Sequence, residues 1–363
     1  MTHLNELYLI LNKSLKWNKS HLKCFVLIML AIILKQTCNL SSASKSLSIK
    51  CLPQSFYRRM QRFFATQYFD YHQISQLIFN MFSFDKVQLT LDRTNWKWGK
   101  RNINILMLAI VYRGIAIPIV WTLLNKRGNS DTNERIALIQ RFISIFGKHR
   151  IVNVFADREF IGEQWFTWLI AKDINFCIRV KKNFIITNHL GNNYKISDLF
   201  RYLQVGQIEC RKRRILVGRV KLYISALRLE NGELLVVVSP HFTAHGIRDY
   251  ALRWEIETLF SCLKGRGFNL ENTRLTDPRR VKKLIAVLAI GFCWSYLTGE
   301  WRHDQVKAIK IKKHGRLTMS LFRYGLDYVQ VAIQRLICFG KKEEFKQILA
   351  ILRREKPDKI RVL

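Results

Sequence analysis

Residues 87–121 read VQLTLDRTNWKWGKRNINILMLAIVYRGIAIPIVW, and the fold class follows largely from this stretch. It contains three apolar runs rich in β-branched residues, at 87–94, 103–113 and 115–121, with short turns between them. Such runs predict three consecutive β-strands in an antiparallel meander. The first run carries one carboxylate, Asp92, at or just beyond the end of its apolar part.

Helix and strand patterns alternate downstream of this meander. A D-x-x-E capping box opens an amphipathic helix at Asp131. IVNVFADREF (151–160) contains an apolar strand that ends at Asp157, and a helix at about 161–172 and a strand at 175–181 follow it. Consecutive strands followed by alternating helices and strands predict an α/β domain built on a mixed sheet.

The chain carries a large excess of positive charge. Its 363 residues include 61 Lys and Arg but only 26 Asp and Glu, a formal net charge of +35, and the basic residues are spread along the sequence. An excess of this size repels itself unless a polyanion is near, and it exceeds what solubility requires. A broad surface for nucleic acid is therefore expected. The hydrophobic share of 49% allows a sizeable core and excludes wholesale disorder.

The cysteines and the apolar runs predict a cytoplasmic protein without membrane association. The eight cysteines show neither CxxC pairs nor a Cys/His spacing for zinc, so reduced thiols are expected. The apolar runs at 24–34 and 284–299 are shorter than a usual bilayer span and are expected to be buried helices. No small-residue cleavage site follows the first run promptly, so it does not read as a signal peptide.

Changes of pattern divide the chain into five regions. Residues 1–75 read as helices with a polar turn before the basic aromatic stretch SFYRRMQRFF, which suits either a helix-turn-helix-like DNA-binding unit or an ordinary basic helical hairpin. Residues 182–240 hold short apolar runs between turn signals and read as a β-rich insertion. The expected regions are a helical DNA-binding region (1–75), an α/β core in two parts (76–181 and 241–300), the β-rich insertion (182–240) between them, and a basic helical C-terminal region (301–363).

The stretch DYALRWEIETLFSCLKGRG (249–267) predicts a single helix from about 246 to 264 with one apolar and one polar flank. At about 100° per residue, four polar side chains fall within an arc of roughly 60° on one side of this helix. They are Tyr250, Arg253, Glu257 and Lys264. A carboxylate between two cations and a phenol suits a metal site that handles phosphates.

Three carboxylates are candidates for one metal site. Asp92 and Asp157 each follow an apolar strand, and they converge if the two strands are neighbours in the sheet. A helix laid across the sheet edge can then bring in Glu257. Oxygen ligands of this kind suit Mg²⁺ or Mn²⁺, and two such ions can support in-line phosphoryl transfer. Taken singly, an aspartate at a strand end is more often a turn former, and Glu257 can simply pair with Arg253 on the surface.

The spacing Y-x2-R-x3-E-x6-K, at positions 250, 253, 257 and 264, resembles the Y-R-E-K signature of bacterial insertion-sequence transposases of family four. The contexts LTLDRTNW around Asp92 and ADREF around Asp157 resemble the first two acidic motifs of that family. The resemblance runs from the N-terminal helical region to about residue 300. It implies a DDE transposase whose RNase H-like core, a mixed sheet flanked by helices, is interrupted by a β-rich insertion before the glutamate.

The resemblance also implies roles for the individual residues. Asp92, Asp157 and Glu257 would be the catalytic triad that binds Mg²⁺ or Mn²⁺. The phenol and the two cations of the signature would bind DNA phosphates near the cut strand ends. Members of the family cut a mobile element from donor DNA, leaving a 3′-OH that attacks a phosphodiester of target DNA. They act as homodimers that bridge the terminal inverted repeats of the element, in the bacterial cytoplasm and on its nucleoid.

One feature of well-studied relatives is missing from the insertion. They carry a tryptophan on an insertion strand that stacks on an extruded base during a DNA-hairpin step. The corresponding stretch here, ELLVVVSP, has none, and Trp165, Trp168 and Trp254 lie on predicted helices, where core positions are expected. The sequence therefore does not predict the hairpin step. Glu159, beside Asp157, reads more as a solvated or capping residue than as a secondary metal ligand.

Two other functions remain compatible with these residues. A protein of the same fold can bind DNA without catalysis, although all three acidic positions and their three signature partners are present here. An RNase H-like nuclease that only hydrolyses would carry the same acidic triad, but the Y-R-E-K spacing disfavours it. An Mg²⁺-dependent DNA transposase is therefore the leading hypothesis.

Overall fold

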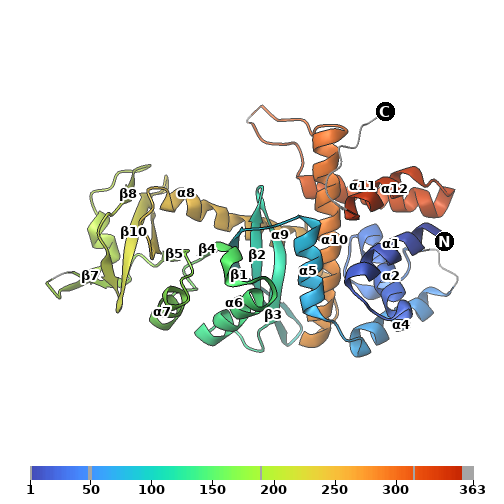
Figure 1. Cartoon of the computed structure of the whole chain (residues 1–363), viewed down its shortest axis with the longest axis horizontal. Coiled ribbons are helices and arrows are strands. Elements are labelled where there is room, and N and C mark those ends of the chain that lie inside the picture. The colour runs from blue at the N-terminus through green and yellow to red at the C-terminus, as the bar shows by residue number, and fades with distance from the viewer. Residues whose placement is uncertain (1, 48–50, 189, 314, 354–363) are drawn as a thin grey trace. The chain divides into compact units, whose positions relative to one another are not determined.

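The computed structural model describes residues 2–47, 51–188, 190–313 and 315–353, and the chain divides into two compact units. We call them the helical unit and the sheet unit after their main content (Figure 1). The helical unit groups Met1–Ser83, Trp96–Arg101 and Phe260–Leu363, and the sheet unit groups Phe84–Asn95 and Asn102–Leu259.

The described strands form one mixed, eleven-stranded sheet. They are β1 (Val87–Trp98), β2 (Arg101–Tyr112), β3 (Ile115–Leu123), β4 (Ile151–Ala156), β5 (Phe176–Val180), β6 (Ile185–Thr187), β7 (Asn193–Lys195), β8 (Ile208–Cys210), β9 (Ile215–Val217), β10 (Val220–Arg228) and β11 (Leu234–Ser239). Their order is β3-β2-β1-β4-β5-β11-β10-β9-β6-β7, and β8 pairs with β10 beside this path. β4 runs parallel to both β1 and β5, whereas β2 and β3 are antiparallel. The α/β fold with a mixed sheet that the sequence predicts is confirmed.

Apolar residues fill the centre of the sheet. Along β2, every residue from Ile103 to Ile110 is buried, and a run without alternation marks a strand that is covered on both faces. Helix α6 (Thr132–Phe146) packs against β3 (Figure 1). It begins at the predicted capping box, in which Asp131 and Glu134 each accept the backbone N–H of the other. Each fully buried Ile or Leu of this core contributes about 1.5–3 kcal/mol to the stability of the fold.

Residues 182–240 extend the same sheet beyond β5. β11 pairs antiparallel with β5, and Val237 lies opposite Arg179. Two hairpins of this region turn at glycines with positive φ, Gly191 at 83° and Gly232 at 78°, a conformation that glycine adopts without steric cost. Helix α7 (Glu163–Ala171) precedes β5 in the chain, and a short 3₁₀ helix, η2 (Ile196–Phe200), follows β7.

The helical unit is built around one long apolar helix, α10 (Pro278–Gln305). Asp277 caps its N-terminus by accepting two backbone N–H groups, and Pro278 occupies the first helical position, where a missing N–H costs nothing. All residues from 284 to 300 are buried. The other helices of this unit are α1 (Thr2–Ser14), α2 (Lys19–Lys35), α3 (Leu40–Ala43), α4 (Pro53–Thr66), α5 (Tyr71–Met81), α11 (Leu321–Phe339) and α12 (Glu343–Leu352). Two of the expected region boundaries, 75/76 and 300/301, fall inside α5 and α10.

Helix α10 is long and apolar enough to cross a membrane, and it is longer than the apolar run from which it was expected. However, 89% of its most apolar window is buried inside the protein, and the core helices of other proteins pass the same test. The only other candidate membrane span in the described residues is the pair α1 and α2. It is long and apolar enough only when the two helices are joined across a bend of 115°.

Two glycines allow α10 and α11 to touch backbone to backbone. A Cβ on Gly299 would lie 1.9 Å from the carbonyl oxygen of Leu321, and one on Gly325 would lie 1.8 Å from that of Ser295. We expect Gly325→Ala to lower the free energy of unfolding by about 3 kcal/mol, the upper end for overpacking, because a backbone clash cannot be relieved by a rotamer change. A urea titration measures this loss. Gly265→Ala is the control, since a Cβ there meets nothing within 4 Å, and equal midpoints for the two variants would contradict the close packing.

Candidate active site

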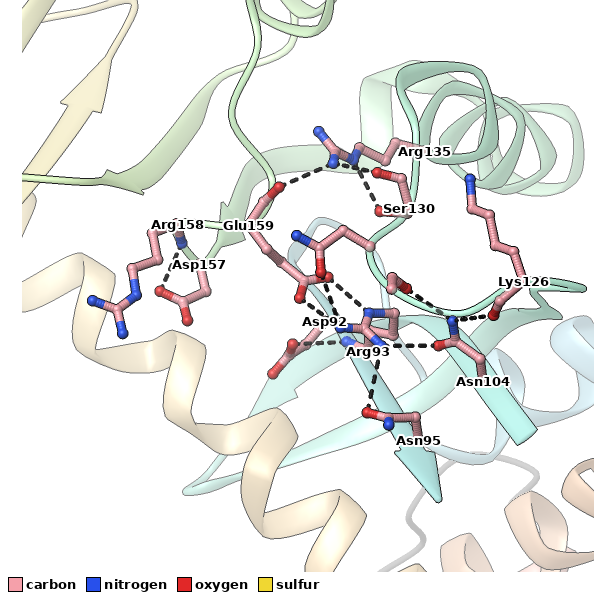
Figure 2. A network of polar contacts seen from close by, with 12 residues as sticks. Asp92, Arg93, Asn95, Asn104, Lys126, Ser130, Arg135, Asp157, Arg158 and Glu159 are labelled. Carbon is pink, nitrogen blue, oxygen red and sulfur yellow. Dashed lines mark hydrogen bonds and ion pairs between the residues drawn. The ribbon is translucent and has the colours of Figure 1, made fainter. Parts of the chain in front are cut away.

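Asp92 and Asp157 occupy matching positions on two neighbouring strands. β1 and β4 pair in parallel with Leu91 opposite Ala156, so the next residue on each strand is an aspartate. Neighbouring strands lie about 4.8 Å apart, and the two carboxyl groups therefore start from adjacent backbone positions (Figure 2). The expectation that these two strands are neighbours is confirmed.

Burial makes the charged form of Asp92 unfavourable. Its side chain is 16% exposed, and the loss of hydration is the main cause that raises its pKa from 3.8 to about 7. The negative charges of Glu159 and Asp157 act in the same direction. The backbone N–H of Arg93, which donates over 2.7 Å, and the guanidinium of Arg253 act against it. Asp92 therefore needs a positive charge nearby to stay ionised at neutral pH.

The signature stretch forms two helices, so the predicted single helix is wrong. α8 (Gly246–Ala251) and α9 (Glu255–Leu263) are separated by a 3₁₀ turn, η3 (Leu252–Trp254). At this turn two charged side chains, Arg253 and Glu255, are buried and bond into the sheet unit. Buried charges require partners, and these tertiary contacts prevail over the regular helix that the local sequence favours.

Helix α8 packs on the sheet and places Tyr250 beside Asp157. Tyr250 is buried in an apolar cluster with Phe155 of β4, Cys177 of β5 and Val237 of β11. Its hydroxyl donates a hydrogen bond to Oδ1 of Asp157 over 3.3 Å. Burial raises the pKa of Tyr250 well above its usual value, so the hydroxyl stays protonated and remains a donor.

Arg253 is a buried cation between two carboxylates. Its side chain is 3% exposed, with Nη1 at 3.4 Å from Oδ2 of Asp92 and Nη2 at 2.7 Å from Oε1 of Glu257. Its backbone carbonyl accepts a hydrogen bond from the hydroxyl of Thr90 on β1. The guanidinium also lies 4.5 Å from the ring centre of Trp254. The i,i+4 pairing with Glu257 that the alternative interpretation expected is therefore present, but its arginine is buried and also contacts Asp92.

The structure brings five of the six predicted site residues into one connected group. They are Asp92, Asp157, Tyr250, Arg253 and Glu257. The sixth, Lys264, belongs to the helical unit. There its ammonium group pairs with Glu271 over 2.7 Å and lies 5.9 Å from the ring centre of Trp96.

The carboxylate oxygens of this group are chemically suited to a hard divalent ion. Mg²⁺ and Mn²⁺ prefer such ligands, and the burial that raises the pKa of Asp92 makes a nearby positive charge favourable there. Within the described ranges, no three His, Cys, Asp or Glu side chains gather closely enough to hold one ion. The guanidinium of Arg253 instead lies between Asp92 and Glu257. An ion bound by both carboxylates therefore requires Arg253 to give up at least one of these contacts.

The sequence pattern did not indicate a role for Arg93, and the interpretation of Glu159 as a solvated or capping residue is wrong. Nε and Nη2 of Arg93 each lie 3.1 Å from an oxygen of Glu159, whose side chain is 21% exposed (Figure 2). Glu159 is therefore held in an ion pair and is neither solvated nor a cap. Both residues stand in the motifs around Asp92 and Asp157, but only the pairing of β1 with β4 brings them together.

Glu255 is a second residue that sequence reasoning missed. Its carboxylate is buried and accepts the backbone N–H groups of Tyr112 and Gly114 over 2.7 and 2.9 Å. These two bonds fasten the start of α9 to the turn between β2 and β3. Its sequence context, between Trp254 and Ile256, carries no signal of such a contact.

The three tryptophans that were expected in the core differ from one another. Trp165 is fully buried, and its ring stacks on that of Trp168 at 5.7 Å. Trp254 is 52% exposed, so the core position expected for it is wrong. Arg253, which precedes it in η3, is buried.

The sheet unit thus carries two aspartates at matching positions on parallel neighbouring strands, and α9 carries a glutamate that is linked to one of them through Arg253. The family model of the transposase DDE domain matches residues 83–294, more than half of the chain. The chain therefore belongs to the transposase DDE domain family, and it is a transposase, a protein of DNA transposition and recombination. No curated protein matches it in sequence.

Proposed function

We propose that this protein is a transposase of insertion-sequence family four that excises its element and inserts it elsewhere by cut-and-paste transposition. The observation that carries the proposal is the group of Asp92 and Asp157 on neighbouring strands with Tyr250 and Arg253 bonded to them. The Y-R-E-K spacing supports the assignment to family four. In this reaction the enzyme hydrolyses a phosphodiester at each element end, and the freed 3′-OH then attacks a phosphodiester of target DNA.

Asp92, Asp157 and Glu257 would hold the divalent ions, Mg²⁺ or Mn²⁺, that this chemistry requires. Bound there, a pair of such ions would activate the attacking oxygen and stabilise the leaving oxygen of an in-line displacement. The carboxylates themselves fix where positive charge collects, beside the middle of β1 and the end of β4. The negative charge of the buried Asp92 would be compensated by the ions as it is now by Arg253.

The other signature residues would bind the phosphate that reacts. Tyr250 keeps its proton and can donate its O–H to a non-bridging phosphate oxygen. Arg253 can present two N–H groups in parallel to the same phosphate, a geometry that guanidinium and phosphate share. Such donors stabilise the negative charge that grows at phosphorus in the transition state. By its place in the signature, Lys264 would bind a further DNA phosphate.

The DNA partners follow from charge and from the helical unit. We propose that the protein binds the terminal inverted repeats of its element as a homodimer and also engages target DNA, in the cytoplasm of a bacterium. Residues 1–75 would help to read the ends. Within them, α4 buries Phe56 and Met60 while it exposes Arg58, Arg59 and Arg62, as a helix that faces DNA would.

A plasmid that carries this reading frame with its flanking DNA is the substrate that tests the proposal. The purified full chain is incubated with this plasmid, a second circular plasmid and Mg²⁺. Excision of the segment and its covalent joining to the second plasmid support a transposase of this kind. Nicking without joining would replace it with a purely hydrolytic nuclease, and binding without any cleavage would replace it with an inactive DNA-binding protein.

A further inference from the structure

Arg93 and Glu159 join the two strands that carry Asp92 and Asp157. Arg93 directly follows Asp92 in β1, and Glu159 stands two residues after Asp157 beyond β4. The two groups face each other as a fork, with both nitrogen-to-oxygen distances at 3.1 Å and side chains 13% and 21% exposed (Figure 2). A shielded, bidentate pair holds its geometry far better than an exposed, single-contact pair.

Asparagine side chains hold the guanidinium of Arg93 in place. It donates to the amide oxygens of Asn104 and Asn129, each over 3.2 Å. Asn104, which is 2% exposed, donates in turn to the backbone carbonyls of Lys126 and Gly128 (Figure 2). Arg93 is therefore anchored to β2 and to the loop that follows β3, and it has little freedom to rotate.

A second arginine fixes the backbone on which Glu159 stands. Arg135 of α6 is buried, and its guanidinium donates to the carbonyl oxygen of Glu159 and to Ser130 (Figure 2). It also donates to the carbonyl oxygen of Ile161. The loop that begins at Asp157 is thus bonded to Arg135 through backbone carbonyls and to Arg93 through the side chain of Glu159. Hydrogen bonds to the rest of the sheet unit therefore hold both the Arg93 guanidinium and the Glu159 backbone.

We propose that the Arg93–Glu159 pair is a clasp that sets the separation of Asp92 and Asp157, which makes both members positioning residues for the metal-binding carboxylates. The inference rests on the proposed function, because it assigns those two aspartates to the ions. Two carboxylates that share ions must be held at a fixed distance against their mutual repulsion. Arg93 is one residue from Asp92 and Glu159 is two residues from Asp157, so the ion pair links the backbone beside one aspartate to the backbone beside the other. The charges of Arg93 and Glu159 cancel each other.

The same two strands offer a matched control at their other ends. Asp85 precedes β1 and Arg150 precedes β4, and they form an ion pair at 2.7 Å. Their side chains are 83% and 31% exposed, and they lie at the ends of the strands away from the two catalytic aspartates. Arg150→Gln and Asp85→Asn each remove one charge from the same strands, of the same sign as Arg93→Gln and Glu159→Gln respectively, without touching the clasp.

Binding of Mn²⁺ to the metal-free full chain, followed by electron paramagnetic resonance, is the first readout. We expect Arg93→Gln and Glu159→Gln each to weaken Mn²⁺ binding by about 10- to 100-fold, the usual effect of losing an outer-shell partner. Arg150→Gln and Asp85→Asn should change it less than about twofold, as exposed pairs do. Strand cleavage should show a lower kcat for the clasp variants, with KM for DNA unchanged.

Two further variants test whether geometry and pairing matter. Arg93→Lys keeps the charge but cannot make two parallel bonds, so most of the loss should persist. The double variant of Arg93→Gln with Glu159→Gln should bind Mn²⁺ at least as tightly as the single variant with the lower Mn²⁺ affinity, because the two residues act as one pair. Thermal melting of every variant shows whether the fold is retained.

Three results would overturn the clasp. One is a lower melting temperature with unchanged Mn²⁺ binding, which would leave only a structural role. Another is full recovery with Arg93→Lys. The third is a Glu159→Gln variant that loses Mn²⁺ as completely as Asp157→Asn while Arg93→Gln keeps it, because Glu159 would then be a ligand. A wild type that binds Mn²⁺ but cuts no DNA overturns the proposed function, and the Mn²⁺ titrations still decide whether the clasp exists.

Discussion

Asp157→Asn is expected to abolish cleavage and joining of DNA by this protein while leaving DNA binding intact. The change removes one negative charge and one oxygen from the proposed metal site, where bound ions would supply several kcal/mol of transition-state stabilisation, so a loss of about a thousandfold or more is expected. The amide is isosteric with the carboxylate, and it can still accept the hydrogen bond of Tyr250. Asp92→Asn should behave in the same way.

Single-turnover cleavage of the plasmid substrate and filter binding of the same DNA measure the two effects separately. Asp173→Asn is the control, because Asp173 lies in the same unit but its side chain is 82% exposed and pairs with Lys148. Cleavage by the control should match the wild type. An Asp157→Asn variant that still cuts at a rate within tenfold of the wild type would remove Asp157 from the catalytic group.

Arg253→Gln is expected to lower the free energy of unfolding of the metal-free protein and to make its stability strongly dependent on Mg²⁺. Arg253 is the buried partner of Asp92, and removing one member of a buried pair costs up to several kcal/mol. Glu257 is 44% exposed and loses less. We expect a net loss of about 2 kcal/mol, because water and protonation of Asp92 relieve part of the cost.

Added Mg²⁺ should restore more stability to this variant than it adds to the wild type. In the wild type an ion competes with the guanidinium of Arg253 for the carboxylates, whereas in the variant that guanidinium is gone. Denaturation midpoints with and without Mg²⁺ measure the difference. Arg228→Gln is the control, since the guanidinium of that arginine donates to the backbone carbonyls of Phe200, Leu203 and Gly232 and not to a carboxylate of the site. An equal Mg²⁺ shift in Arg253→Gln and wild type would contradict the competition.

The parts of the site that follow from strand periodicity were predictable from the sequence. Asp92 and Asp157 each end an apolar run, and their convergence requires only that β1 and β4 pair in parallel. The helix that carries Glu257 was also visible, because its apolar side has clear spacing. These features depend on local patterns and on one general property of α/β sheets.

The contacts that hold the site together were not predictable in the same way. Arg253 and Glu255 are charged residues in a stretch that reads as one amphipathic helix, and only the tertiary fold shows that both are buried. Their contacts with β1 and with the β2–β3 turn span more than 140 residues of sequence. The exposure of Trp254 was not predictable either, because the local pattern does not show which side of this stretch the fold buries.

If Asp92 and Asp157 bind the ions that support strand cleavage, a change of ligand chemistry at Asp157 should change which ion supports the reaction. Asp157→Cys replaces a hard oxygen with a thiolate, which Mg²⁺ binds poorly and the softer Mn²⁺ tolerates better. Rates of plasmid cleavage are measured for wild type and variant in each ion. We expect the variant to be inactive with Mg²⁺ and to cleave at least about tenfold faster with Mn²⁺ than with Mg²⁺. Cleavage by the variant at equal rates with Mg²⁺ and Mn²⁺ would contradict the role of Asp157 as a metal ligand.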